Sequence, residues 1–158
     1  MSNFYNEIGT EDILFILGHP WKLTESEWKL QDKYMFEHTL SDIYNRLKLS
    51  VADGYTRLWK TSDGEPIAIL GCYKVADAIY ETFFIGSHHM EAHALKLSFE
   101  MRNLLREKAP GYKGCTCRLY STSDHPSQMT WFRFLGFRYL PEGDLGTTRY
   151  FEYKSPSS

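Results

Sequence analysis

The sequence predicts an α+β domain, with a mixed α/β sheet whose faces are covered by helices. Two observations carry this prediction. Segments with the composition of β-strands come in adjacent runs, and segments with helical periodicity lie between those runs. The stretch from Ala78 to Arg106 shows the change of pattern most clearly, because an apolar, β-branched run at Ile79–Ile85 is followed by a helical stripe after Gly86.

The N-terminal third is predicted to hold one short strand and two helices. Phe4–Ile8 has the composition of a strand. Thr10 has the features of a helix N-cap, because two acidic residues and then an apolar run follow it, and this helix ends at Gly18. A second helix is expected at Glu27–Ser50, where the apolar spacing is loose and a break near His38 would divide it in two.

The remainder of the chain is predicted to supply most of the sheet. A turn with the Asp-Gly signature at Ser62–Glu65 joins the first two strands of this part as a hairpin. Helices are expected at Met90–Lys108 and Gln128–Leu135, each followed by a glycine-containing stop. The expected strands are Tyr55–Thr61, Pro66–Val75, Ile79–Ile85, Cys115–Thr122, Phe137–Leu140 and Thr147–Tyr153.

Length and composition indicate one globular domain. The 158 residues are enough to bury a substantial core, and we expect residues 1–153 to form the domain and residues 154–158 to be a flexible tail. The formal net charge is −2 without a basic tract, which argues against a nucleic-acid-binding protein. Aromatic residues make up 16% of the chain, which favours a large buried contact with a partner or a flat ligand.

The cellular setting expected from the sequence is the cytoplasm. The N-terminus has no signal-peptide pattern, and no apolar run approaches the ~20 residues that span a bilayer. Three cysteines, Cys72, Cys115 and Cys117, form an odd set without a disulfide framework, which favours a reducing compartment. The spacing of Cys115 and Cys117 is too tight for a zinc knuckle, so buried thiols are the simpler interpretation.

The turn between the strand Ile79–Ile85 and the helix after it is a candidate anion site. The first N–H groups of a helix have no partner within the helix, and the helix dipole is positive there, so a phosphate is a typical guest. The alternative is an ordinary strand–helix unit whose turn binds nothing.

Two local patterns resemble the GNAT acyltransferase superfamily. The segment WFRFLGF at Trp131–Phe137, followed by a strand, is similar to the aromatic helix and Gly-Phe ending of GNAT domains. The segment HMEAHA at His89–Ala94 falls where these proteins carry an Arg/Gln-x-x-Gly-x-Gly/Ala loop, five residues after a strand position that Phe84 fills. The resemblance covers Tyr55–Tyr153. It implies the GNAT fold, with the strands Ile79–Ile85 and Cys115–Thr122 parallel and splayed apart.

The resemblance also implies acetyl-CoA as cofactor. The backbone at Phe84 would hold the pantetheine arm, and the loop would hold the pyrophosphate. The match is altered, since His89 stands for the arginine or glutamine and Ala92 for the first glycine, and a Cβ limits how closely a phosphate approaches the backbone. The cofactor-binding residues implied in this way are Phe84, Ile85, Gly86, His89, Ala92, His93 and Ala94.

The catalytic positions implied by the resemblance are altered further. Phe132 stands where GNAT enzymes often have a tyrosine acid, and His125 aligns with their asparagine. Tyr120 lies near the position of a glutamate often found in the preceding strand. Glu81 is the best remaining carboxylate for a base, with a solvent-facing strand residue as the alternative.

Three functions stay open at this point. The first is an acetyl-CoA-dependent N-acetyltransferase acting on an amine-bearing small molecule or protein. The second is a non-catalytic GNAT-like module that docks onto other proteins, as in the internal virion or ejection-associated proteins of short-tailed bacteriophages, which the chain resembles from Ser123 to Phe137. The third is a metal site at His88, His89, His93 and Glu91, but Met90 stands where a zincin has its glutamate, so we expect no metal.

Overall fold

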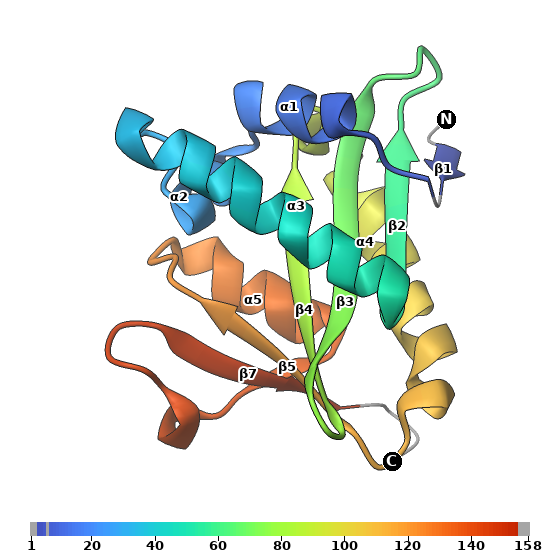
Figure 1. Cartoon of the computed structure of the whole chain (residues 1–158), viewed down its shortest axis with the longest axis vertical. Helices are drawn as coiled ribbons and strands as arrows, with labels where there is room; N and C mark the ends of the chain where they lie inside the picture. The colour runs from blue at the N-terminus through green and yellow to red at the C-terminus, as the bar shows by residue number, and fades with distance from the viewer. Residues whose placement is uncertain (1–2, 6, 155–158) are drawn as a thin grey trace.

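A computed structural model, which describes residues 3–5 and 7–154, contains one mixed seven-stranded sheet (Figure 1). Neighbouring strands follow the order β1-β2-β3-β4-β5-β7-β6, and every pair is antiparallel except β4 and β5. The strands are β1 Asn3–Tyr5, β2 Gly54–Lys60, β3 Pro66–Ala76, β4 Ile79–Gly86, β5 Thr116–Ser121, β6 Phe137–Tyr139 and β7 Arg149–Tyr153. The predicted mixed sheet is confirmed.

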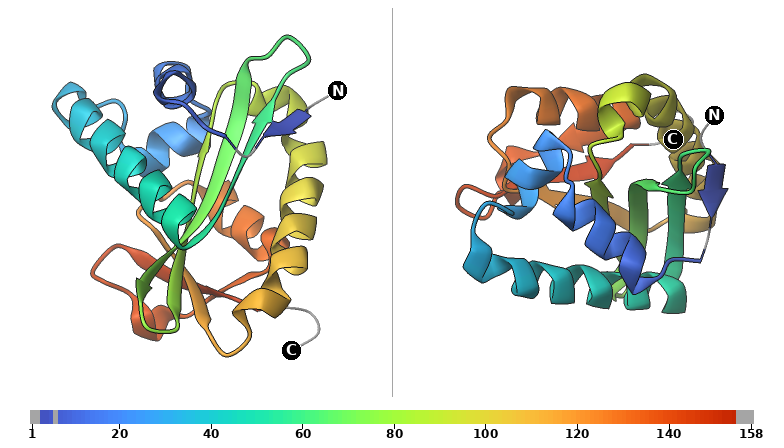
Figure 2. Two further views of the ribbon diagram at one scale, coloured as in Figure 1. Left: turned by 45° about the vertical axis from the view of Figure 1, so that its right-hand side comes forward. Right: turned by 90° about the horizontal axis from the view of Figure 1, so that it is seen from above.

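Helices cover both faces of the sheet (Figure 2). The α-helices are α1 Thr10–Gly18, α2 Lys22–Trp28, α3 Phe36–Ala52, α4 Met90–Lys108 and α5 Pro126–Leu135, and short 3-10 turns lie at Lys33–Met35, Ala109–Tyr112 and Pro141–Gly143. Helices α1 and α3 pack on one face of β3, whereas α4 packs beside α5 on the other. Among the described residues, no helix is long and apolar enough to cross a membrane.

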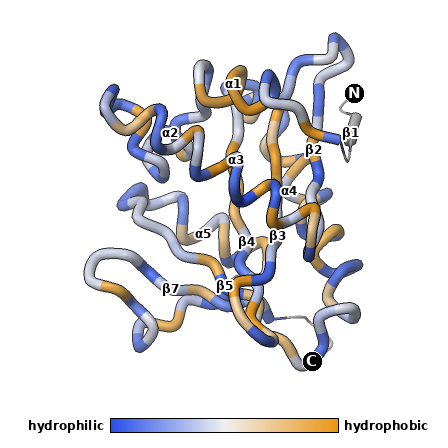
Figure 3. The backbone as a smooth tube through the Cα atoms, in the orientation of Figure 1, coloured by the Kyte–Doolittle hydropathy of each residue, from blue (hydrophilic) through white to orange (hydrophobic). Residues whose placement is uncertain are grey.

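The core has two parts, one on each side of the sheet. Ile43 of α3 and Ile69 of β3 belong to one part, and Leu97 of α4 and Leu70 of β3 belong to the other. The alternation of Ile69 and Leu70 between the two parts follows from the two-residue period of a strand. Both faces of β3 are therefore buried, which explains its almost continuous apolar sequence (Figure 3).

Strands β4 and β5 pair only at their beginnings. The parallel ladder joins Ile79 to Thr116, Tyr80 to Cys117 and Glu81 to Arg118, whereas β4 pairs with β3 along its whole length. After Glu81 the two strands separate, and α2 and α3 lie over the gap on one side (Figure 1). The expected splay of the two parallel strands is confirmed.

The expectation of one helix at Glu27–Ser50 is wrong. Helix α2 ends at Trp28 because Lys29 adopts a left-handed conformation with φ of 54°, and α3 starts only at Phe36. A left-handed residue is a common helix terminator, but lysine gives no sequence signal for it. The break therefore lies before the expected position at His38.

Two smaller expectations near the N-terminus also need correction. The first strand is Asn3–Tyr5, and residues 7 and 8 of the expected Phe4–Ile8 are not strand, while residue 6 lies outside the described residues. Helix α1 is capped by Gly9, whose N–H donates to the Asp12 carboxylate over 2.9 Å, so Thr10 is the first helical residue. Of the expected tail, residues 155–158 also lie outside the described residues.

Candidate functional site

A groove of about 510 Å³ opens where β4 and β5 separate, beneath α2 and α3. The walls combine carboxylates with aromatic rings from five secondary-structure elements. Four of the predicted site residues line this groove: Glu81, Phe84, Tyr120 and Phe132. The splayed strands therefore bring together side chains that lie up to 51 residues apart in the chain, the spacing from Glu81 to Phe132.

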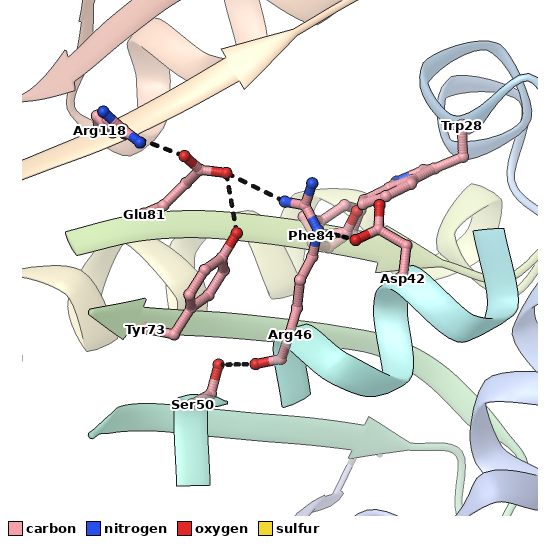
Figure 4. Close-up of polar contacts among 8 residues, drawn as sticks. All are labelled: Trp28, Asp42, Arg46, Ser50, Tyr73, Glu81, Phe84 and Arg118. Carbon is pink, nitrogen blue, oxygen red and sulfur yellow. Dashed lines mark hydrogen bonds and ion pairs between the residues drawn. The ribbon is translucent and has the colours of Figure 1, made fainter. Parts of the chain in front are cut away.

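Glu81 is buried, with 8% of its surface exposed, and is held from three sides (Figure 4). Arg118 Nε donates to Oε1 over 3.0 Å, while Arg46 Nη1 and Tyr73 Oη donate to Oε2 over 3.2 and 2.9 Å. The alternative of a solvent-facing Glu81 is wrong. A carboxylate offers about four acceptor positions, so these bonds leave one of them, on Oε1, for a ligand or water.

Tyr73 is a hydrogen-bond donor in this arrangement. Burial raises the pKa of Tyr73, nearby Arg46 opposes that rise, and Glu81 adds to it, so that the pKa lies well above its ordinary value. The phenol is therefore protonated at neutral pH and donates to the Glu81 carboxylate. This bond fixes the direction in which Glu81 faces the groove.

Arg46 is the residue around which the α3 side of the groove is built. Its Nε donates to Asp42 Oδ1 over 3.0 Å, one helical turn away, and its guanidinium lies 5.2 Å from the centre of the Trp28 ring. The cluster of Asp42, Glu81, Arg46 and Arg118 holds equal numbers of opposite charges. The guanidinium group of Arg46 thus lies between the Asp42 carboxylate and the Trp28 ring.

The other two predicted catalytic residues in the groove differ in character. Tyr120 is half-buried, and its ring lies 5.1 Å from that of Tyr150. Phe132 is 3% exposed and packs against Phe151, with 5.1 Å between ring centres. Tyr120 is therefore a phenol in the groove, whereas Phe132 contributes an apolar wall.

His125 lies away from the groove walls and has a structural contact. Its Nδ1 accepts a hydrogen bond from the Ser127 N–H over 3.2 Å, which caps the N-terminus of α5. The structure therefore brings Glu81 and Tyr120 together in one groove and leaves His125 outside its lining.

The predicted phosphate-binding turn has few free donors. The His88 N–H donates to the His19 carbonyl over 2.7 Å, and the His89 N–H donates to Ser87 Oγ over 3.2 Å. The N–H groups of residues 90–92 donate to carbonyl groups three residues earlier. A phosphate at this turn would have to replace these internal partners.

The histidines beside this turn pack with one another and with Phe15. The rings of His88 and His89 are 4.2 Å apart, and His89 Nε2 lies 3.0 Å from Glu65 Oε1. Partial burial lowers the pKa of His93, which disfavours the charged ring that would attract a phosphate. In the part of the chain that the structure describes, no group of three or more His, Cys, Asp or Glu side chains is placed so that it could hold a metal ion.

The remaining predicted cofactor residues lie on or near the last part of β4 and the start of α4. Ile85 is fully buried against the α1–α3 side of the core, and Gly86 is also buried. Ala92, His93 and Ala94 lie in the first turns of α4. Apart from Phe84, the predicted cofactor residues do not line the groove.

At Phe84 and Gly86, the edge of β4 that faces away from β3 is bonded to α2 and to the residue before it. The Trp28 indole N–H donates to the Phe84 carbonyl over 3.1 Å, and the Gly86 N–H donates to Thr24 Oγ1 over 2.8 Å. The Trp21 N–H donates to the Gly86 carbonyl over 2.9 Å. The backbone groups at which the pantetheine arm was expected are therefore bonded to α2 and to the residue before it.

The sequence analysis missed several groove residues. Asp42 and Arg46 carry a usable signal, because opposite charges four residues apart face one another on a helix. Tyr73 carries no signal of its own, since its partner Glu81 is identified only by the β3–β4 register. Gln128 is 4% exposed in the wall of the groove, and its Oε1 has no hydrogen-bond partner among the described residues.

Three solved structures illustrate what the chain is similar to. A GNAT-family acetyltransferase from Staphylococcus aureus Mu50 is 13% identical, with a TM-score of 0.70 over 97% of this chain and 98% of that chain. A PaiA N-acetyltransferase from Thermoplasma acidophilum, in complex with coenzyme A, is 16% identical, with a TM-score of 0.59 over 98% and 99%. A spermidine N-acetyltransferase chimera from Vibrio cholerae is 13% identical, with a TM-score of 0.59 over 96% and 94%.

No family model and no curated protein matches the chain. None of the structural neighbours supports the expected resemblance to a bacteriophage subgroup. At these low identities the structural likeness concerns the fold, over almost the full length of the proteins compared. The chain has the GNAT acyl-CoA N-acyltransferase fold.

Proposed function

We propose that the chain is an acetyl-CoA-dependent N-acetyltransferase that is closed to its cofactor in the arrangement described above. The groove at the splayed ends of β4 and β5 carries this proposal, because it joins a held carboxylate to a phenol in a fold shared with acetyltransferases. The acceptor is an amine of a small molecule or of a protein. The spermidine N-acetyltransferase chimera among the structural neighbours supports an amine acceptor by analogy.

The residues of the groove can support removal of a proton from the acceptor. An amine is protonated at neutral pH and must become neutral before it attacks a carbonyl. Glu81 has one acceptor position left on Oε1, which suits a water molecule or the ammonium itself. Tyr120 is the phenol in the groove and takes the place of Phe132 as the proposed proton donor.

A thiol-release assay with acetyl-CoA tests this function, with mass spectrometry of the acceptor as an independent readout. The acceptors are spermidine, a set of primary amines and lysine peptides. We expect slow acetylation in the wild type, and Glu81→Gln or Tyr120→Phe should lower the rate by ~10²–10⁴ if either group transfers a proton.

Two exposed residues supply matched controls. Tyr34 is 96% exposed and Glu107 is exposed in the last turn of α4, so Tyr34→Phe and Glu107→Gln repeat the same chemical changes away from the groove and from the His89–Ala94 loop. Both should keep the wild-type rate. A rate that all four substitutions leave unchanged would show that the chemistry lies elsewhere.

A second candidate function is a non-catalytic docking module, and the closed gap between β4 and β5 favours it. The internal contacts of α2 there, together with Phe132 in place of an acid, are compatible with a protein that keeps the fold without the reaction. A role among other virion proteins rests on the sequence resemblance alone. Absence of any acetylated product, with the protein folded and CoA bound, would favour this candidate over the enzyme.

A further inference from the structure

We propose that the segment Trp21–Trp28 and CoA compete for the same gap between β4 and β5, so that the cofactor binds only after α2 moves away. This inference concerns the regulation of the proposed acetyltransferase and rests on that function for its biological meaning. The binding competition itself can be measured without turnover.

The competition follows first from the free edge of β4. Residues two apart in a strand direct their N–H and C=O groups to the same edge, so Phe84 and Gly86 share one. Pairing of β4 with β5 stops at Glu81, so β5 supplies no partner for Phe84 or Gly86. Their partners across this edge belong to α2 and to the residue before it. Buried backbone groups need partners, so removing α2 leaves this edge open for another donor and acceptor.

The second argument is the aromatic cluster that fills the gap. The Trp21 ring is 6% exposed and lies edge-on to Phe84 and Trp131, with ring centres 6.2 and 5.7 Å away. The Trp131 indole N–H donates to Ser98 Oγ over 2.8 Å, which ties α5 to α4. Aromatic side chains therefore pack against the Phe84 ring on this side of the sheet.

The third argument is that α2 is attached to both strands. Glu27 Oε1 accepts from Ser121 Oγ over 2.5 Å, and Glu27 Oε2 accepts from the Thr122 N–H over 2.6 Å. These residues lie at the end of β5, whereas Thr24 and Trp28 bind β4. Helix α2 thus spans the gap from one strand to the other.

Release of α2 would break its contacts on both sides of the gap and relieve one strained residue. The helix has seven residues and ends at Trp28, and the next residue, Lys29, has a φ of 54° that is unfavourable for a residue with a Cβ. The strain at Lys29 can relax when α2 detaches. Helix α2 is held to β4 by Thr24 and Trp28, and to the end of β5 and the segment after it by Ser26 and Glu27. The contacts of a bound cofactor must therefore offset the loss of bonds on both sides of the gap.

Titration calorimetry of the whole chain with CoA, in the absence of an acceptor, tests the competition. Thr24→Val keeps the shape of the side chain and removes its bond to β4, whereas Trp28→Phe removes the indole N–H together with one ring. Each should tighten CoA binding by at least about fivefold, the ratio that corresponds to one hydrogen bond. Lys22→Ala, on the exposed face of the same helix, is the matched control and should leave the affinity unchanged.

Hydrogen exchange of the wild type gives a second readout that needs no variant. CoA should increase exchange at residues 22–28, because the cofactor displaces them. Tight CoA binding with unchanged exchange there would overturn the proposal. So would equal affinities in Thr24→Val, Trp28→Phe and wild type, or no CoA binding to either variant once exchange shows that α2 is loosened. If CoA binds as expected but no acceptor is acetylated, the competition stands and the proposed enzyme fails.

Discussion

Glu81→Gln should destabilise the protein by about 2 kcal/mol. The substitution keeps the size of the side chain but removes the charge that both Arg46 and Arg118 contact. Breaking a buried ion pair from one side typically costs ~3–5 kcal/mol. The arginine side chains are 25% and 27% exposed, so water partly compensates them and the lower figure of about 2 kcal/mol is expected. Urea unfolding followed by tryptophan fluorescence measures the change.

The control for this measurement is Glu91→Gln, which makes the same chemical change at an exposed site and should alter stability by less than about 0.5 kcal/mol. A double-mutant cycle with Arg118→Met isolates the pair, and we expect a coupling energy of about 1 kcal/mol or more because the 3.0 Å contact joins two charges. Equal free energies of unfolding for Glu81→Gln and Glu91→Gln would show that Glu81 does not hold the groove together.

Further substitutions test the packing around the groove and the sheet, each by thermal unfolding. Gly71→Ala should cost about 1–3 kcal/mol, because a Cβ would lie 2.2 Å from the buried Phe83 ring, whereas Gly111→Ala meets open space and should be neutral. Lys29→Gly should raise stability by up to about 1 kcal/mol, since glycine accepts the left-handed conformation without strain, and a lower melting temperature would contradict the role of this residue as a strained terminator. Gln128→Leu should not lower stability, because the buried Oε1 lacks a partner among the described residues, and a loss above about 1 kcal/mol would show that the amide is bonded.

The sheet and the long helix were predictable because their signals are local. The apolar run of β3 reflects burial on both faces, and the stripe of α4 gave its bounds Met90–Lys108 without error. The splay of β4 and β5 came from the family resemblance, and no local pattern encodes it. The break after α2 was not predictable, because Lys29 is an ordinary helix residue that tertiary packing holds in a left-handed conformation.

The candidate site was predictable only in part. Glu81 and Phe84 were named through the resemblance to GNAT acyltransferases, but the partners of Glu81 come from α3, β3 and β5, up to 37 residues away. Such contacts depend on strand register and helix placement, which a single sequence does not specify. The same limit applies to the bond between the Trp28 indole N–H and the Phe84 carbonyl, which joins residues 56 positions apart.

The short parallel ladder between β4 and β5 has a consequence for the way the molecule opens. Residues 116–153 form a unit in which β5, β7 and β6 pair with one another, and this unit meets the rest of the sheet through only the pairs from Ile79 to Glu81. Cooperative opening follows the seams where fewest contacts must break. At this seam those contacts are side-chain packing rather than strand pairing, because Leu119, Phe132 and Phe151 share one core cluster with Leu97 and Met101 of α4. Separation of residues 116–153 from the rest of the sheet therefore requires that this shared core opens, and α2, which bridges the seam through Glu27, opposes it.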